Sequence, residues 1–155
     1  MLSLYLTAEL NGVTDLRPKD NSEFPFWYTF KVQCTSCRET HPNAISINRF
    51  EVVEKPILSG NANFARLRES SATSLIPPIA YHQESPAKRQ KIIEFDSRGL
   101  ELLEFLPEGE WLANGTQSGN LFTKIDLTEG EWFDYDESSG EEVSIVDLKW
   151  EISKN

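Results

Sequence analysis

The sequence predicts an all-β protein built as two similar antiparallel sheet halves, which pack as a β-sandwich-like unit with a pseudo-two-fold repeat. Two observations lead to this prediction. Apolar and polar residues alternate with a period of two in several segments, and no stretch of ten residues shows convincing helical periodicity. A pattern of strand, glycine and proline also occurs once in each half of the chain.

The period-two segments occur along the whole chain. In residues 2–10 the apolar side chains share one face, and Asn11-Gly12 then marks a turn. Residues 64–75 are the best candidate for a short turn of helix. The other predicted strands are residues 26–34, 44–54, 91–97 and 146–152.

The predicted halves are residues 1–75 and 91–155, with residues 76–90 as the linker between them. The region 73–90 holds three of the eight prolines and shows no clear period. The repeated pattern is LTAELNGVTDLRP in the first half and IIEFDSRGLELLEFLP in the second. Two such units would bury the inner faces of their sheets against each other, so a single compact domain is compatible with this division.

The charge of the chain limits its partners. The 155 residues include 25 acidic and 15 basic side chains, for a formal net charge of −10. Such a surface repels nucleic acid and anionic membranes, so we expect neither as a partner. No segment approaches the roughly 20 apolar residues that span a bilayer. A protein partner with a basic surface, or a cation, fits this charge better.

The N-terminal residues bear on localisation. The first ten residues, MLSLYLTAEL, alternate apolar and polar side chains and lack both the basic start and the apolar block of a signal peptide. We therefore expect a cytoplasmic protein, with the nucleus as a second location.

The most acidic stretch is residues 126–142, which contains eight acidic residues and no Lys or Arg. From Asp134 onward its spacing is close to a calcium loop, but Ser139 stands where that loop needs Gly and Ile145 where it needs Glu. We therefore predict a hairpin with Ser-Ser-Gly at its tip and a solvated acidic edge, which discourages aggregation. Its aromatic residues are expected to contribute to packing: Trp132, Phe133 and Tyr135.

Cys34 and Cys37 are the only cysteines in the chain. Two thiolates at this spacing are half of a tetrahedral zinc site. In a reducing compartment a structural disulfide is disfavoured, so metal ligation, redox chemistry and an inert pair are the alternatives. His41 follows closely enough to supply a third ligand, whereas His82 lies in the predicted linker and is expected to be exposed.

Thiol redox catalysis fits the pattern less well than metal binding. A thioredoxin-type pair places its first Cys at the N-terminus of a helix, where the thiol pKa is lowered. This pair follows a predicted strand, and Pro42 comes soon after it. Hydrolytic triads, phosphate-binding loops and dinucleotide-binding glycine patterns are absent from the sequence. We therefore expect no enzymatic activity.

Six strings of the sequence together resemble the eukaryotic CXXC-motif-containing zinc-binding protein family, also known as DUF866 or UPF0587. They are LTAELNGVTDLRP, FKVQCTSCRE, NRFEVVEKP, RESSAT, IIEFDSRGLE and DLTEGEWFDYDESSGEEVSI. The resemblance covers nearly the whole chain. It implies a mostly β protein of two similar halves, without established catalytic activity, with one zinc ion held by two Cys-x-x-Cys pairs in the N-terminal half. On that pattern Cys34 and Cys37 are zinc ligands.

The second Cys pair of the family pattern is missing from this chain. The family places it just before RESS, where this sequence reads NANFARLRESSAT, and Ser97 stands where a Cys is common. We therefore expect a degenerate zinc site. It would hold zinc weakly with His41 or water, share a metal between two chains of a dimer, or hold none in a monomer.

These expectations give two functional interpretations. The first is a non-enzymatic binding or adaptor protein in metal handling, with a protein partner. The alternative is a thiol redox or metal-transfer protein that uses Cys34 and Cys37 chemically.

Overall fold

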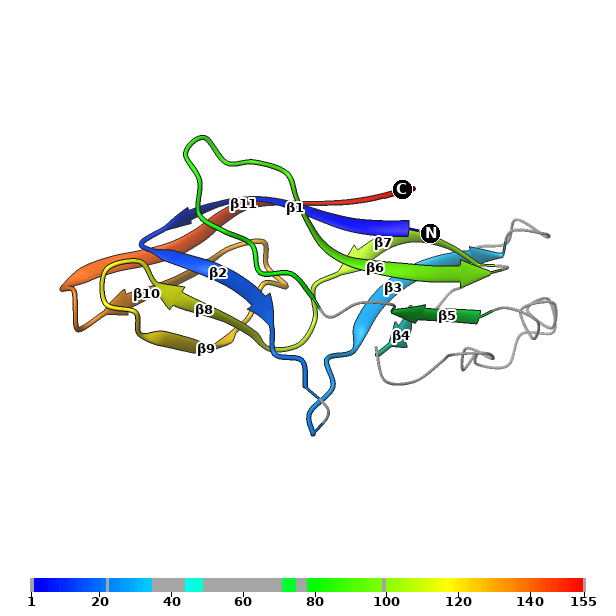
Figure 1. Ribbon diagram of the computed structural model, residues 1–155, viewed down its shortest axis with the longest axis horizontal. Helices are drawn as coiled ribbons and strands as arrows, with labels where there is room; N and C mark the ends of the chain where they lie inside the picture. Colours follow the sequence, from blue (N-terminus) through cyan, green and yellow to red (C-terminus); the bar gives the residue numbers. More distant parts are fainter. Residues whose placement is uncertain are drawn as a thin grey trace.

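The computed structural model describes residues 2–21, 23–34, 44–48, 71–74, 78–98 and 100–154. Within these ranges the chain forms eleven β-strands and no helix, which confirms the all-β fold class (Figure 1). Accordingly, none of the described residues belongs to a helix able to cross a membrane.

The strands follow one another with short turns in several places. Their bounds are β1 (Leu2–Asn11), β2 (Val13–Pro18), β3 (Tyr28–Cys34), β4 (Ile45–Ile47), β5 (Ser71–Ser74), β6 (Gln90–Arg98), β7 (Leu100–Leu106), β8 (Trp111–Gly115), β9 (Leu121–Ile125), β10 (Trp132–Asp136) and β11 (Glu141–Lys154).

These strands form three antiparallel sheets. One has the order β10-β11-β1-β6-β5, and the two smaller sheets have the orders β2-β8-β9 and β4-β3-β7. Strands β1, β6 and β11 run along the upper side of the molecule, while β2, β8 and β9 lie below them at one end and β3 and β4 at the other (Figure 1). The chain termini lie close together, because β1 and β11 pair from Leu2 opposite Lys154 onward.

The pairing order repeats within the molecule. Strand β1 continues into β2, which pairs with the β8–β9 hairpin, and β6 continues into β7, which pairs with the β3–β4 hairpin. In the large sheet β11 flanks β1 as β5 flanks β6. The two-fold relation therefore exchanges β1 with β6, and each sheet combines strands from residues 1–75 with strands from 91–155. The boundary at residues 76–90 stays a prediction.

The turn between β1 and β2 shows why the sequence places Asn11-Gly12 there. Gly12 has φ +75°, and a Cβ atom at this position would lie 2.8 Å from Cγ1 of Val143. Both the left-handed backbone and the close approach of β11 require glycine.

Two predicted elements differ from the observed ones. In the predicted strand 44–54 only Ile45–Ile47 is observed as a strand, and residues 49–54 lie outside the described residues. The short helix expected within residues 64–75 is wrong where it can be checked, because Ser71–Ser74 is strand β5, held at the sheet edge by pairing with β6. Residues 64–70 and Leu75 lie outside the described part.

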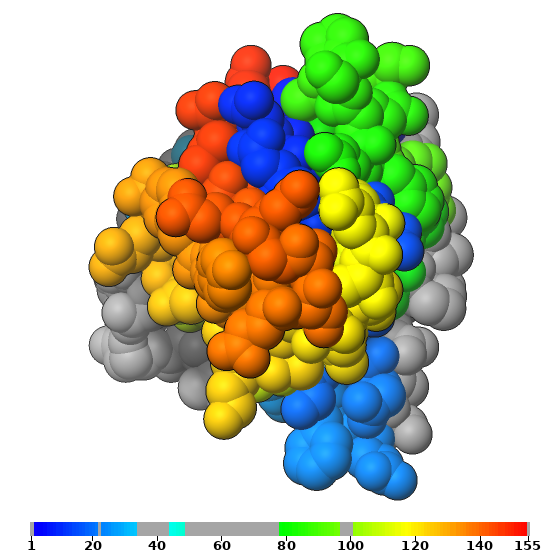
Figure 2. All heavy atoms as spheres, turned by 90° about the vertical axis from the view of Figure 1, so that its left-hand side faces the viewer, coloured from blue at the N-terminus to red at the C-terminus, as the bar shows by residue number. Residues whose placement is uncertain are grey.

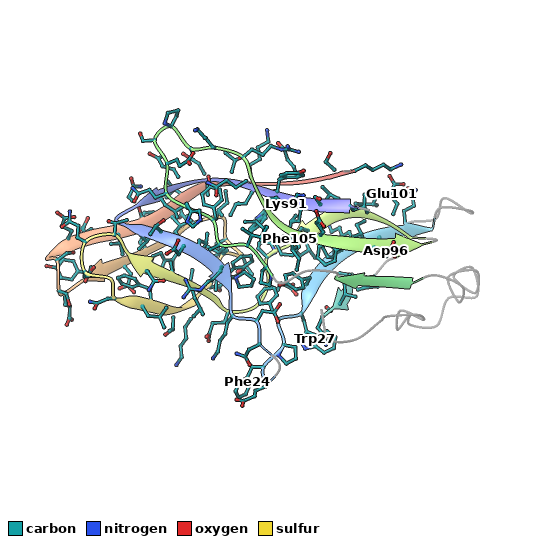
Figure 3. The ribbon with its side chains drawn as sticks, viewed as in Figure 1. Phe24, Trp27, Lys91, Asp96, Glu101 and Phe105 are labelled. Carbon is teal, nitrogen blue, oxygen red and sulfur yellow. The ribbon has the colours of Figure 1, made fainter. Side chains whose placement is uncertain are left out.

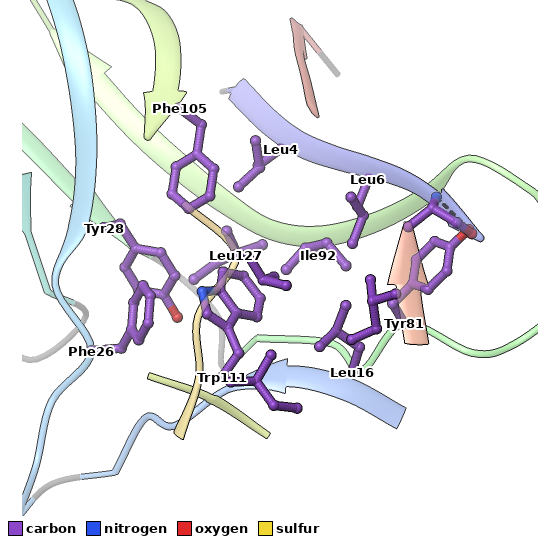
Figure 4. Close-up of a cluster of buried hydrophobic side chains, with 14 of the residues drawn as sticks. Leu4, Leu6, Leu16, Phe26, Tyr28, Tyr81, Ile92, Phe105, Trp111 and Leu127 are labelled. Atoms are coloured by element: carbon purple, nitrogen blue, oxygen red, sulfur yellow. Dashed lines mark hydrogen bonds between the residues drawn. The ribbon is translucent and has the colours of Figure 1, made fainter. Parts of the chain in front are cut away.

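Aromatic side chains from all three sheets form the centre of the core. Their rings contact one another edge to face or tilted, with centroids 4.8–6.4 Å apart (Figure 4). The contacts close into a ring that consists of Phe26, Tyr28, Phe95, Phe30, Phe105, Trp150 and Trp111. Because such contacts add to the burial of large apolar surfaces, this cluster joins the three sheets into one core.

Tyr81 attaches residues 78–90 to this core. Its backbone pairs with Leu16 of β2, with N···O distances of 2.9 and 2.7 Å. Its buried hydroxyl accepts a hydrogen bond from the amide of Ala8 (3.0 Å) and lies 2.7 Å from the carbonyl of Lys88, to which it donates. Ala8 is at a bulge of β1, beyond the end of the β1–β6 ladder, so the hydroxyl replaces a strand partner there.

We expect the substitution Tyr81→Phe to lower the free energy of unfolding by about 1–3 kcal/mol, because the buried amide of Ala8 loses its partner. Urea unfolding of both proteins measures the change. The matched control is Tyr135→Phe, which removes a hydroxyl from a side chain that is 51% exposed and should leave stability within about 0.5 kcal/mol. Equal effects of the two substitutions would contradict the role given to Tyr81.

Candidate metal centre

Cys34 is the last residue of β3, and its backbone pairs with Leu100 of β7. Strand β3 is central in its sheet, with β7 on one side and β4 on the other. Two of its residues, Phe30 and Val32, are fully buried and hold the strand to the core. The Cys-x-x-Cys motif therefore begins at the end of a strand that is paired there with β7 alone, since β4 pairs only with Tyr28–Phe30, and it continues into the connection from β3 to β4.

The other predicted ligands of this connection, Cys37 and His41, lie outside the described residues, as does the side chain of Cys34. His82 is described, and the prediction that it is exposed is confirmed. Its Nδ1 atom lies 2.7 Å from a carboxylate oxygen of Asp15 in β2. The described part of the chain brings no three His, Cys, Asp or Glu side chains together in a metal-binding arrangement.

The donor set of this chain does not fit a closed structural zinc site. Such a site needs four ligands, and the sequence contains two cysteines in total. Of the two histidines, His82 is hydrogen-bonded to Asp15. His41 is the histidine nearer in sequence to the cysteine pair. That Cys34 and Cys37 are zinc ligands stays a prediction from the sequence.

The two-fold relation gives this hairpin a counterpart in β8–β9. The turn between β8 and β9 is joined to the turn of the β10–β11 hairpin by one buried carboxylate, Asp136, which is 2% exposed. Ser118 donates a short hydrogen bond to one carboxylate oxygen, while the other accepts from the side chain of Asn120 (3.2 Å) and the amide of Ser138 (3.1 Å). Asn120 also donates to the Ser138 hydroxyl at 2.7 Å.

These hydrogen bonds lower the pKa of Asp136 from its usual value of 3.8. The largest cause is the Ser118 hydroxyl, and backbone and Asn120 donors add to it against the opposing effect of burial. The charged carboxylate thus holds two turns together in the C-terminal half.

The predicted β10–β11 hairpin is confirmed, but two features of it are not as predicted. Asp136 belongs to the run that we expected to be a solvated acidic edge, yet it is buried. Phe133 and Tyr135 were expected to contribute to packing, yet they are 63% and 51% exposed. Of the three aromatic residues only Trp132 packs inward, against Phe122 with centroids 5.6 Å apart. The alternation of side chains along β10 could have predicted this difference in exposure, because Phe133 and Tyr135 share the face opposite to Trp132 and Asp136.

The chain is similar to known proteins in both sequence and fold. The family model described as "CXXC motif containing zinc binding protein, eukaryotic" matches residues 3–153. UPF0587 protein C2D10.03c of Schizosaccharomyces pombe is 45% identical over 98% of this chain and 97% of its own length. The mouse CXXC motif containing zinc binding protein is 35% identical over 99% of this chain and 98% of its own length.

Solved structures give the same result. The crystal structure of C1orf123 superimposes with a TM-score of 0.84 and 30% identity, and the match covers 99% of both chains. A hypothetical protein from Plasmodium falciparum has a TM-score of 0.79 over 98% of both chains at 23% identity, which bears on the fold alone.

Fold and site together define a small all-β protein of two interlocked halves, with a Cys-x-x-Cys motif between two strands of the N-terminal half. The chain belongs to the eukaryotic family of CXXC motif containing zinc binding proteins.

We expect Asp136→Asn to destabilise the protein at neutral pH. Because the folded pKa of Asp136 is below the unfolded one, its charged form stabilises the fold above pH 3.8, and this contribution is lost as the pH falls through the folded pKa. Denaturant unfolding at several pH values between 7 and 3 should therefore show a stability difference between the variant and the wild type that shrinks with acid. Glu137→Gln, at an exposed neighbour, is the control. A difference that is the same at every pH would contradict this role.

Proposed function

We propose that this protein is a non-enzymatic binding protein, an adaptor in metal handling in the cytosol or nucleus, with a degenerate zinc site at Cys34 and Cys37. The observation that carries the proposal is the incomplete donor set: two thiolates in the chain, and no metal-binding group of three or more donors among the described residues. The family name supports zinc as the metal.

A half-site of this kind has different energetics from a structural zinc site. A complete site contributes about 10–16 kcal/mol at neutral pH, and that free energy stabilises the fold. Two thiolates leave coordination positions open, so a bound ion is held weakly and exchanges with other ligands. The aromatic core, and sheets that combine strands from both halves, support a fold that does not need the metal.

We expect the purified, tag-free protein to contain less than one zinc per chain by native mass spectrometry, and a chelator to remove it. Unfolding should stay cooperative after chelation, with an unchanged midpoint, because the core does not rest on the metal. The double substitution Cys34→Ser, Cys37→Ser is the control and should bind no zinc. One zinc per monomer that resists the chelator would contradict a degenerate site, and one zinc per two chains would indicate a metal shared in a dimer.

The thiol redox alternative is supported less well. In that mechanism the first Cys needs a lowered pKa, which a helix N-terminus usually provides. Cys34 is the last residue of strand β3, and Pro42 follows soon after the pair, a sequence that does not favour a long helix. We therefore propose that the pair acts as a metal ligand and not as a redox catalyst.

Alkylation of the metal-free protein distinguishes these functions. We expect Cys34 and Cys37 to react with iodoacetamide at pH 7 no faster than the thiol of a short unstructured peptide, because most of an unperturbed thiol with a pKa near 8.5 is protonated at that pH. Mass spectrometry of samples quenched over time measures the rate. Labelling at least tenfold faster than the peptide would favour the redox function.

A further inference from the structure

Tyr5 and Glu151 form a binding site for an arginine within the large sheet. They lie directly opposite each other on β1 and β11. The guanidinium carbon of Arg89 lies 3.6 Å from the centre of the Tyr5 ring, and Nε of Arg89 is 2.6 Å from a carboxylate oxygen of Glu151. An arginine from another part of the chain is thus held by the face of a tyrosine and a neighbouring carboxylate, an arrangement suited to its planar group.

The same pair of residue types occurs again on the same sheet. Tyr135 of β10 lies directly opposite Glu142 of β11. Counting along β11 through its pairs with β1 places Glu142 on the face that also carries Glu151. Both tyrosine–glutamate pairs therefore present their side chains on the outer face of the large sheet, and β11 supplies the glutamate in each.

The second pair has no cation from the described part of the chain. Glu142 takes part in no salt bridge with a described residue, and residues 126–142 contain no Lys or Arg. The side chain of Tyr135 is 51% exposed, and that of Phe133, two positions along the same face, is 63% exposed. These residues border an open hollow of about 640 Å³ on the β10–β11 hairpin. The hairpin faces the viewer in Figure 2, in orange.

The edge of the hairpin is less suited to binding than its face. Strand β10 is the outermost strand of the large sheet. The amide of Tyr135 is bonded to the carboxylate of Asp134 at 2.7 Å, which leaves it unable to pair with an added strand. A partner is thus directed to the aromatic and acidic face, where side chains make the contacts.

We propose that the face formed by Phe133, Tyr135 and Glu142 binds an arginine side chain of a partner protein. The arginine stacks on Tyr135 and bonds to Glu142, as Arg89 does on Tyr5 and Glu151. Seven exposed acidic residues in 126–142, all those of this stretch except the buried Asp136, complement a basic segment around that arginine. This inference rests on the proposed binding role and gives the chemistry of the partner, but it does not depend on the metal.

The test uses the full-length protein and two blocked peptides of equal charge, tetra-arginine and tetra-lysine, in calorimetric titrations at low salt. We expect the arginine peptide to bind more tightly. Tyr135→Leu should weaken its binding about two- to fivefold, which corresponds to an exposed cation–π contact. Glu142→Gln should cause a comparable loss, and Tyr135→Phe should keep most of the affinity because it keeps the ring.

Two matched controls separate this site from the general charge of the protein. Glu101→Gln removes one exposed negative charge and Phe24→Leu removes one exposed aromatic ring, 64% exposed, and both positions lie away from the hairpin (Figure 3). Neither substitution should weaken the binding of the arginine peptide more than that of the lysine peptide. Absence of binding, equal binding of the two peptides, or equal losses for Glu101→Gln and Glu142→Gln would overturn the proposal.

The zinc measurement is made on the same protein, so the two proposals fail separately. Substitutions that remove the arginine site should leave the zinc content unchanged. Peptide binding should be the same whether or not the protein is found to contain zinc.

Discussion

The double pairing of β1 is the constraint on which the rest of the structure depends. This strand pairs with β11, from the other end of the chain, and with β6, its partner in the two-fold relation. Because β1 and β6 then continue into β2 and β7, each three-stranded sheet takes a strand from the opposite half. Neither half can form its sheets alone, so most pairings join residues far apart in sequence. Such pairings cost loop-closure entropy, and the shared aromatic core offsets that cost.

The C-terminal half holds two of its turns together through one buried carboxylate. Asp136 accepts hydrogen bonds from both the β8–β9 turn and the β10–β11 turn. Because its charged form makes these bonds, their contribution to stability depends on pH, whereas a metal centre depends on metal supply. The contact at Asp136 therefore stabilises its end of the molecule whether or not the proposed half-site at Cys34 and Cys37 holds zinc.

The sequence allowed the strands to be predicted better than their partners. Alternation identifies the strand at residues 2–10, where one face is buried, and the one at 146–152, where Leu148, Trp150 and Ile152 pack partly buried against the core. Asn11-Gly12 identifies a turn by its backbone requirement. The exchange of strands between halves has no local signal, since pairing is decided by the whole core. The burial of Asp136 was missed because a carboxylate within an acidic run is usually solvated, and its donors, Ser118 and Asn120, lie in another turn. Of the predicted ligands, Cys34 is placed at the end of β3 by its strand pattern.

Strand β11 takes part in two tyrosine–glutamate pairs, one in a contact within the chain and one in the proposed binding face. Glu142 and Glu151 of β11 each stand opposite a tyrosine of the neighbouring strand. Within the described part of the chain, only the pair with Glu151 has a basic residue on it, Arg89. Residues 78–90 are fixed over β1 and β2 by Tyr81, so Arg89 reaches Tyr5 and cannot serve the distant hairpin as well. The exposed tyrosine at position 135 is then best understood as the same contact with its cation supplied from outside. The binding role proposed for this face needs no metal, so it does not depend on how many ligands the proposed zinc site has.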